Sequence, residues 1–398
     1  MTSLAARTKL IKPSVTLAIA AKAGKLRAEG VDIVNFSAGE PDFDTPERIK
    51  AAAIEALRKG MTKYTDVRGI EPLREAIAEK YRREYGLTYR KEEVLVSCGA
   101  KHSLYNMLQA VVDPGEEVVI PSPYWVSYSD MALLAGGVPK LIPTDEASGF
   151  RITPAQLQAA LTPRTRVVIL NSPCNPTGAC YDRDELLALA RVLEKHECLI
   201  LADDIYEKII YDDFIVHNLV ALSPALRERT VLINGVSKSY AMTGWRIGYA
   251  LGAAEIIAAA AKIQSQSTSN PTSIAQWAAL EAIRGPQEDV AIMVREFAKR
   301  REVIVNGLNA IQGIRCLKPQ GAFYVFPDVS GLFGKSAKGK AIRTPCDLAD
   351  YLLEEAKVAV VPGEDFGSQK HIRFSYAASL ADIEKGCKRI QDAVTKLG

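Results

Sequence analysis

The sequence predicts an α/β protein with a mostly parallel central sheet, helices on both faces of that sheet, and a smaller α+β part. Two observations favour this fold class. Between about residues 46 and 286, short apolar runs alternate with segments of helical periodicity, which is typical of a parallel sheet buried on both faces. After this region, a long helical segment precedes a strand–helix–strand pattern. At 398 residues, the chain is long enough for two domains.

The apolar runs mark the expected strands in chain order. They span residues 94–96, 118–120, 167–170, 199–202 and 231–233. Helices are expected between them, for example at 101–112 and 185–195. The later part of the chain is expected to form a long helix, a strand, a second helix and a second strand, at residues 288–311, 321–326, 347–356 and 371–376.

The composition narrows the functional classes. The net charge is +3 with basic and acidic residues interspersed, so no nucleic-acid-binding surface is expected. Residues 1–12 lack the apolar core of a signal peptide, and no apolar run reaches the length of a membrane span. The seven cysteines show no CxxC spacing and the four histidines are unpaired. We therefore expect free thiols, no metal site and a cytoplasmic location.

Lys238 is the most informative single residue. It follows the apolar run 231–233, so its amine is expected at the carboxyl end of a strand, where open α/β sheets bind ligands. A desolvated amine near other cations has a lowered pKa and can form a Schiff base with an aldehyde. Arg246 follows closely enough to meet a phosphate on the same ligand. Pyridoxal 5′-phosphate (PLP) carries both groups, whereas a lysine without these neighbours would usually be a solvated surface residue.

Further motifs place this pattern in a family. They are residues 37–43, Tyr64, and residues 123–125, 171–178, 203–206, 235–248, 321–324 and 373–376. In this order, over nearly the whole chain, they resemble the class I aminotransferases, which have the fold type I of PLP-dependent transferases. The resemblance implies a large PLP-binding domain at 46–287. It also implies a small discontinuous domain made of residues 1–45 and 288–398, with a long interdomain helix.

The resemblance assigns four residues to the cofactor ring. Asp203 follows the run 199–202 and matches the carboxylate that keeps the pyridine nitrogen protonated. Tyr206 and Asn175 match the groups that hydrogen-bond the ring oxygen, and Trp125 matches the aromatic side chain that stacks on the ring. From local sequence alone, Asp203 would more often be a turn residue and Trp125 a core residue.

A second group is assigned to the phosphate. Gly99 and Ala100 lie between an expected strand and helix, where backbone amides bind phosphate well, although a plain tight turn fits the local sequence equally. The resemblance adds Ser237 and Arg246 to this site. Tyr64 matches a tyrosine that reaches the phosphate of the neighbouring subunit, which implies a homodimer with shared active sites.

The substrate residues also come from the resemblance. Arg373 matches the arginine that binds the substrate α-carboxylate, because a guanidinium group pairs with a carboxylate through two parallel hydrogen bonds. Gly39, Trp125 and Asn175 assist it. Matches at Lys12, Thr16 and Lys101 indicate the branch of aspartate aminotransferases that includes bifunctional aspartate/prephenate enzymes. The residues that depart from the family pattern are Asp204, Cys174 and His102.

These assignments predict ping-pong transamination between L-aspartate or L-glutamate and the 2-oxo acids oxaloacetate and 2-oxoglutarate, with prephenate as a further acceptor. Lys238 would serve as acid and base. The N-terminal segment would close over the substrate. Alternatives within the same fold are an alanine or aromatic aminotransferase and a C–S β-lyase. A PLP-fold sensor joined to a DNA-binding domain is disfavoured, because the aminotransferase pattern begins by Lys12.

Overall fold

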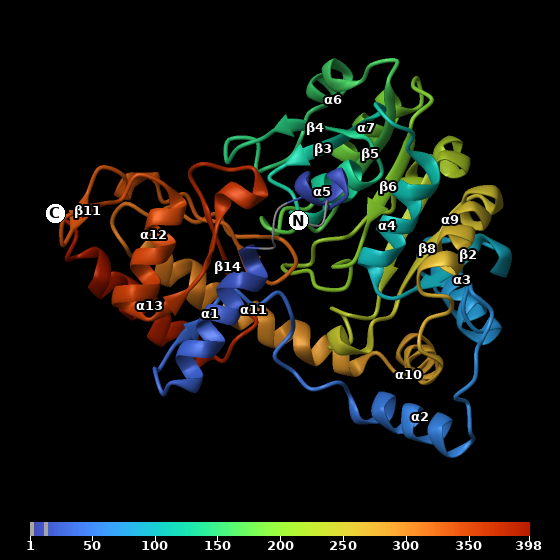
Figure 1. Cartoon of the computed structure of the whole chain (residues 1–398), viewed down its shortest axis with the longest axis horizontal. Coiled ribbons are helices and arrows are strands. Elements are labelled where there is room, and N and C mark those ends of the chain that lie inside the picture. The colour runs from blue at the N-terminus through green and yellow to red at the C-terminus, as the bar shows by residue number, and fades with distance from the viewer. Residues whose placement is uncertain (1–3, 12–14) are drawn as a thin grey trace.

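The computed structural model describes residues 4–11 and 15–398. A seven-stranded sheet forms the larger part (Figure 1), and its strand order is β2-β8-β7-β6-β5-β3-β4. The strands are β2 (Val94–Ser97), β3 (Glu117–Ser122), β4 (Val138–Pro143), β5 (Thr165–Asn171), β6 (Leu199–Asp203), β7 (Thr230–Gly235) and β8 (Gly248–Leu251). All neighbouring pairs are parallel except those that involve β8, which runs antiparallel to β2 and β7. The expected α/β class with a mostly parallel central sheet is confirmed.

Helices cover both faces of this sheet. Side chains alternate along a strand, so Val118 and Ile120 pack in one apolar cluster while Val119 packs in another. The first cluster includes residues of α4, α5 and α9, and the clusters of the opposite face include residues of α2, α3, α6, α7, α8 and α10. These helices are α2 (Glu47–Arg58), α3 (Glu71–Tyr85), α4 (Ala100–Val111), α5 (Ser127–Leu134), α6 (Pro154–Ala160), α7 (Arg183–Leu193), α8 (Leu219–Leu222), α9 (Ala254–Ser267) and α10 (Ser273–Arg284).

A second core combines both ends of the chain. Its sheet has the antiparallel order β13-β14-β9, and the short strand β1 pairs in parallel with β12 through Val34 and Val358. The long helix α11 connects the two parts of the molecule (Figure 1). The elements are α1 (Val15–Ala28), β1 (Val34–Asn35), α11 (Glu288–Asn309), β9 (Tyr324–Val325), β10 (Ser336–Ala337), β11 (Lys340–Ala341), α12 (Pro345–Tyr351), β12 (Val358–Ala359), β13 (Val361–Pro362), β14 (Ile372–Ser375) and α13 (Leu380–Val394). These pairings support a discontinuous small domain, although its division at residues 46 and 287 stays a prediction.

Several element boundaries differ from the expected ones for local reasons. Only Tyr324–Val325 of the expected strand 321–326 is extended, because Ala322 has a positive φ of 58° that interrupts the strand. The expected helix 347–356 is α12 followed by one π-helical turn at Leu352–Ala356, which ends at the left-handed Lys357. Strands β4 and β8 were not expected, since β4 carries two prolines at the edge of the sheet and β8 begins with a glycine.

Throughout the part of the chain that the structure describes, each helix is too short or too polar to cross a membrane.

Candidate active site

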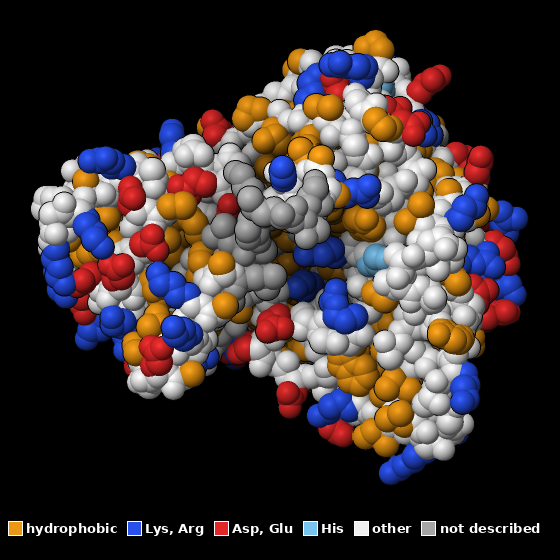
Figure 2. All heavy atoms as spheres, viewed as in Figure 1, with side chains coloured by type: hydrophobic (Ala, Val, Ile, Leu, Met, Phe, Trp, Pro, Cys, Tyr) orange, Lys and Arg blue, Asp and Glu red, His pale blue; other side chains and the backbone are white. Residues whose placement is uncertain are grey.

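The carboxyl ends of β5, β6 and β7 meet at one cavity of about 330 Å³. Lys and Arg side chains (blue) lie in the hollow between the two parts of the molecule (Figure 2). Register sets this meeting point: Asn171 at the end of β5 pairs with Asp203 at the end of β6, and Asp203 pairs with Ile233 of β7. Eleven residues named from the sequence line the cavity, namely Gly39, Ala100, Lys101, Trp125, Asn175, Asp203, Tyr206, Ser237, Lys238, Arg246 and Arg373. Gly99 lies next to it, because a Cβ atom there would collide with Nη2 of the cavity residue Arg246.

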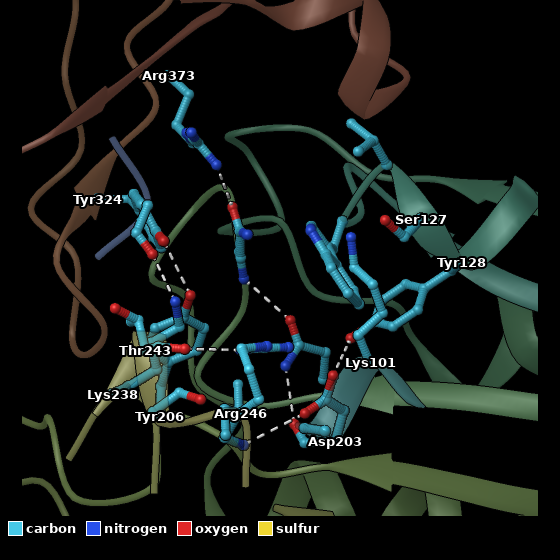
Figure 3. Close-up of a pocket in the computed structure, with 18 residues that line it drawn as sticks. Lys101, Ser127, Tyr128, Asp203, Tyr206, Lys238, Thr243, Arg246, Tyr324 and Arg373 are labelled. Atoms are coloured by element: carbon cyan, nitrogen blue, oxygen red, sulfur yellow. Dashed lines mark hydrogen bonds between the residues drawn. The ribbon is translucent and has the colours of Figure 1, made fainter. Parts of the chain in front are cut away.

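Asp203 lies buried at the floor of the cavity (Figure 3). Its Oδ2 accepts a 2.6 Å hydrogen bond from the Tyr128 hydroxyl, and its Oδ1 accepts one from the Ile205 amide at 3.3 Å. Burial raises the pKa of Asp203 to about 6, although both hydrogen bonds and the nearby Lys238 oppose that shift. The site therefore holds a carboxylate that would be stabilised by a cation placed against it.

Lys238 follows β7, and its amine faces the same cavity. Its Nζ donates a hydrogen bond of 2.5 Å to the Gly39 carbonyl. Burial lowers the pKa of Lys238 to about 8; Glu40 opposes this shift, while the charges of Arg373 and Arg246 reinforce it. An amine with this pKa is partly unprotonated near neutral pH, which is the form that acts as nucleophile and base.

An anion-binding arrangement lies beside Lys238. Gly99 has a positive φ of 87° and precedes helix α4, whose first amides have no partner within the helix. Arg246 is held against this end of α4, because its Nη2 donates to the Cys98 carbonyl at 3.3 Å and its Nη1 to the Thr243 carbonyl at 2.8 Å. Ser237 is buried next to Lys238. A helix N-terminus, a guanidinium group and a hydroxyl together suit a phosphate.

Arg373 enters from the side of the cavity opposite to Lys101 (Figure 3). Arg373 is only 2% exposed. Nη1 donates to Asn175 Oδ1 at 3.1 Å and Nη2 donates to the Ser37 carbonyl at 2.9 Å. Its Nε is buried and has no hydrogen-bond partner among the described residues. A buried donor without a partner is costly, so the geometry favours an anionic ligand at this guanidinium group.

Tyr206 and Lys101 complete the lining. The Tyr206 hydroxyl is hydrogen-bonded to that of Tyr324 at 2.9 Å, and burial raises the Tyr206 pKa well above its usual value, so the phenol stays neutral. Lys101 Nζ lies 4.9 Å from the centre of the Trp125 ring. Burial, and next the charge of Arg246, lower the pKa of Lys101.

Of the other residues named from the sequence, only Tyr64 can be placed relative to the cavity. Tyr64 is 92% exposed and does not line it. Lys12 lies outside the described residues, and the Thr16 side chain is likewise not described, although its backbone belongs to α1.

The residues that depart from the family pattern have partners outside the cavity lining. Cys174 Sγ is 3.7 Å from the Pro123 carbonyl, and burial raises its pKa to about 11. His102 Nε2 is 3.2 Å from Ser267 Oγ. Burial and the charge of Glu207 raise the pKa of Asp204 well above its usual value. None of the three lines the cavity.

Tyr128 and Tyr324 were missed as site residues. Tyr128 lies one helical turn after Trp125, and Tyr324 ends the motif 321–324. Those positions were the only signals in the sequence, since a tyrosine after an aromatic pair is normally part of the core.

The family is decided by comparison with known proteins. A family model described as "Aminotransferase class I and II" matches residues 31–390. This chain belongs to that family. The resemblance inferred from the motifs is therefore confirmed, and membership implies PLP as the cofactor.

Relatives of this aminotransferase are similar over their full length. An aspartate/prephenate aminotransferase of Cereibacter sphaeroides is 52% identical and covers 96% of each chain. An aspartate aminotransferase of Rhizobium meliloti has a crystal structure with a TM-score of 0.97 at 48% identity, covering 100% of both chains. A Thermus thermophilus aspartate aminotransferase solved with maleate has a TM-score of 0.92 at 44% identity, covering 99% of this chain and 100% of that one.

Proposed function

We propose that this aminotransferase transfers the amino group of L-aspartate or L-glutamate to 2-oxo acids, and that it also accepts prephenate. The observation that carries the proposal is the pair of cations across the cavity. Arg373 and Lys101 approach from opposite sides of a space that also holds Lys238 (Figure 3). Two separated cations suit a substrate with two carboxylates. Relatives named aspartate/prephenate aminotransferase, at about half identity over the full length, support the same substrates.

The cavity fits PLP on three grounds. The phosphate would be held at the N-terminus of α4 by Gly99, Ala100, Ser237 and Arg246, where any side chain on Gly99 would collide with Arg246. Lys238 provides an amine with a lowered pKa. Asp203 provides a buried carboxylate for a cationic ring nitrogen. Trp125, Asn175 and Tyr206 line the same cavity and are the proposed contacts of the ring.

The proposed chemistry divides between the cofactor and the chain. PLP, when bound, supplies an electron-poor ring that accepts the charge left when the substrate α-carbon loses its proton. Arg373 and Asn175 would bind the α-carboxylate and fix the direction of the Cα–H bond. Lys238 Nζ would take the proton from Cα and deliver it to the cofactor carbon that keeps the transferred nitrogen, because its pKa of about 8 lies near the working pH. The second 2-oxo acid would reverse this transfer and receive the proton at its own Cα. Asp203 would hold the ring nitrogen in its cationic form.

The remaining parts of the proposal concern assembly and location. The exposed Tyr64 supports a homodimer, since a tyrosine with 92% exposure is accessible to a second copy of the chain and matches the residue that enters the neighbouring site in the family. Lys12 and Thr16 are proposed to act with Lys101 on the second carboxylate. A cytoplasmic location stays a proposal that rests on the composition and the free cysteines.

Specificity constants for oxaloacetate, 2-oxoglutarate, prephenate and pyruvate, measured side by side with each amino donor, test this function. We expect the specificity constants of the three substrates with two carboxylates to exceed that of pyruvate. The reverse order would favour an alanine or aromatic aminotransferase. Release of pyruvate from a cysteine conjugate without amino transfer would favour a C–S β-lyase.

Removal of the Lys101 charge is expected to change specificity rather than all activity. Lys101→Met keeps most of the side-chain volume and removes one charge-assisted contact, which is typically worth about 1.5–3 kcal/mol. The specificity constants for aspartate and prephenate should therefore fall roughly tenfold or more, while that for alanine changes little. Equal losses for all three substrates would contradict a role at the second carboxylate.

Asp203→Asn is expected to stabilise the protein when PLP has been removed. The carboxyl group of Asp203 has a pKa of about 6 in the folded protein. Between about pH 4 and 6 it is therefore more fully protonated in the folded state than in the unfolded state. Its ionisation therefore destabilises the fold as the pH rises through that range. Above that pH range, the loss in the free energy of unfolding levels off on the order of 3 kcal/mol.

Urea unfolding of both stripped proteins from pH 4 to 8 measures this effect. The variant should be the more stable at pH 8, and its advantage should disappear toward pH 4. Reloading with PLP should reverse the order at pH 8, since only the wild type offers a carboxylate to the ring nitrogen. A stability difference that does not vary with pH would contradict the assignment.

A further inference from the structure

Three side chains outside the active site converge between the two parts of the molecule. Glu146 lies in the loop after β4, which extends toward the C-terminal elements (Figure 1). Asp328 follows β9 and His371 precedes β14, and these two residues pair across an antiparallel bridge. One candidate ligand atom from each of the three residues lies within 4.8 Å of the other two. No step of the proposed transamination uses this cluster.

His371 is held with one ring nitrogen free. The residue is 6% exposed, and its ring stacks on Phe326 with centroids 4.9 Å apart. Nδ1 is 2.6 Å from Ser368 Oγ, which fixes the ring orientation. Nε2 is buried, has no hydrogen-bond partner among the described residues, and faces Glu146 Oε1 at 3.9 Å. A buried nitrogen left unpaired beside carboxylates is unfavourable and requires a physical reason.

The cluster already attracts a cation from its rim. Arg315 Nη2 is 3.2 Å from Asp328 Oδ2, and its Nε donates to Glu146 Oε1 at 3.4 Å. The Arg315 side chain is 68% exposed, so it can leave without uncovering a core.

We propose that Glu146, Asp328 and His371 form a Zn²⁺ site that bridges the two parts of the molecule, with the metal ion replacing Arg315. Imidazole and carboxylate oxygens are ordinary zinc ligands, and a water molecule completes a four-coordinate site. The contact of Nδ1 with Ser368 is the outer contact that orients metal-binding histidines. Zinc ligands lie about 2.0–2.2 Å from the metal ion in a tetrahedron, so two ligand atoms are roughly 3.4 Å apart. The three candidate atoms lie within 4.8 Å of one another and must therefore move closer. Rotation of the Glu146 side chain on its loop can provide this closure.

Calorimetric titration of the PLP-loaded protein with Zn²⁺ tests the site, in a non-coordinating buffer at pH 7.5 without substrate. We expect one Zn²⁺ per chain. Glu146→Gln and His371→Asn should each weaken binding at least about tenfold, whereas Arg315→Gln should tighten it by removing the competing cation. His217→Asn and Cys346→Ser, which change a histidine and an exposed thiol outside the cluster, should leave binding unchanged.

Equal Zn²⁺ affinity in Glu146→Gln and the wild type would overturn the proposal, as would the absence of binding below about 1 mM. Weaker binding in Arg315→Gln would also contradict it, because it would make the arginine a partner of the metal ion rather than its competitor. If His371→Asn fails to fold, Glu146→Gln and Arg315→Gln still carry the test, since their opposite shifts have no common structural cause. Co²⁺ provides a second readout, because a tetrahedral site gives visible absorption that Glu146→Gln should lose.

Discussion

Lys238→Ala is expected to reduce transamination by roughly 10⁴-fold and to abolish covalent attachment of PLP. Lys238 lines the cavity and has a pKa of about 8, and its amine lies near the end of β7 among other cations. The substitution removes both the group that forms the covalent link and the base that moves the α-proton. Removal of a positioned base alone typically costs a factor of 10² to 10⁴, and loss of the link adds to it.

Borohydride reduction followed by peptide mapping measures the attachment. In the wild type the label should lie at residue 238, and in Lys238→Ala the visible absorbance should disappear after reduction and dialysis. Lys101→Ala is the matched control, since Lys101 lines the same cavity but should leave the label at 238. A label that moved to Lys101 in Lys238→Ala, or that occupied another lysine in the wild type, would refute the assignment.

The sequence located the active site because its residues lie at the ends of regular elements. Asp203 and Lys238 each follow a continuous apolar run, and parallel strands place their carboxyl ends at one edge. The positions of both residues in the chain therefore determined their meeting in space. Arg373 differs, because it lies within β14 of the small sheet. Only the family resemblance connected it with this cavity.

Contacts that depend on packing could not be predicted in this way. The hydrogen bond from Tyr128 to Asp203 requires the turn between β3 and α5 to deliver a phenol to the end of β6. No periodicity indicates that path. The cluster of Glu146, Asp328 and His371 is the clearest case, since isolated histidines and the absence of CxxC spacing predicted no metal site. Its members are far apart in the chain and meet only because the loop after β4 reaches the small sheet.

Arg373→Lys is expected to raise the Michaelis constant for aspartate sharply. The guanidinium group already uses Nη1 on Asn175 and Nη2 on the Ser37 carbonyl, while its Nε is buried without a partner. These contacts hold the planar group in one orientation. An ammonium group cannot maintain both contacts and also offer paired donors to a carboxylate. The loss of one such buried contact is on the order of 2–4 kcal/mol, or roughly 30- to 700-fold in the specificity constant.

Steady-state kinetics with aspartate, glutamate and alanine separates this role from a general loss of structure. All three substrates carry an α-carboxylate, so Arg373→Lys should lower the specificity constants for all of them by similar factors. Lys101→Met, in contrast, should leave the specificity constant for alanine nearly unchanged. Arg301→Lys is the matched control. Arg301 is equally buried and donates to the Pro319 carbonyl, but it does not line the cavity. It should therefore lower thermal stability and leave the Michaelis constants unchanged. If Arg373→Lys behaved like Arg301→Lys, the guanidinium group would be a structural link between β14 and residues 37 and 175, and the α-carboxylate would have to bind elsewhere.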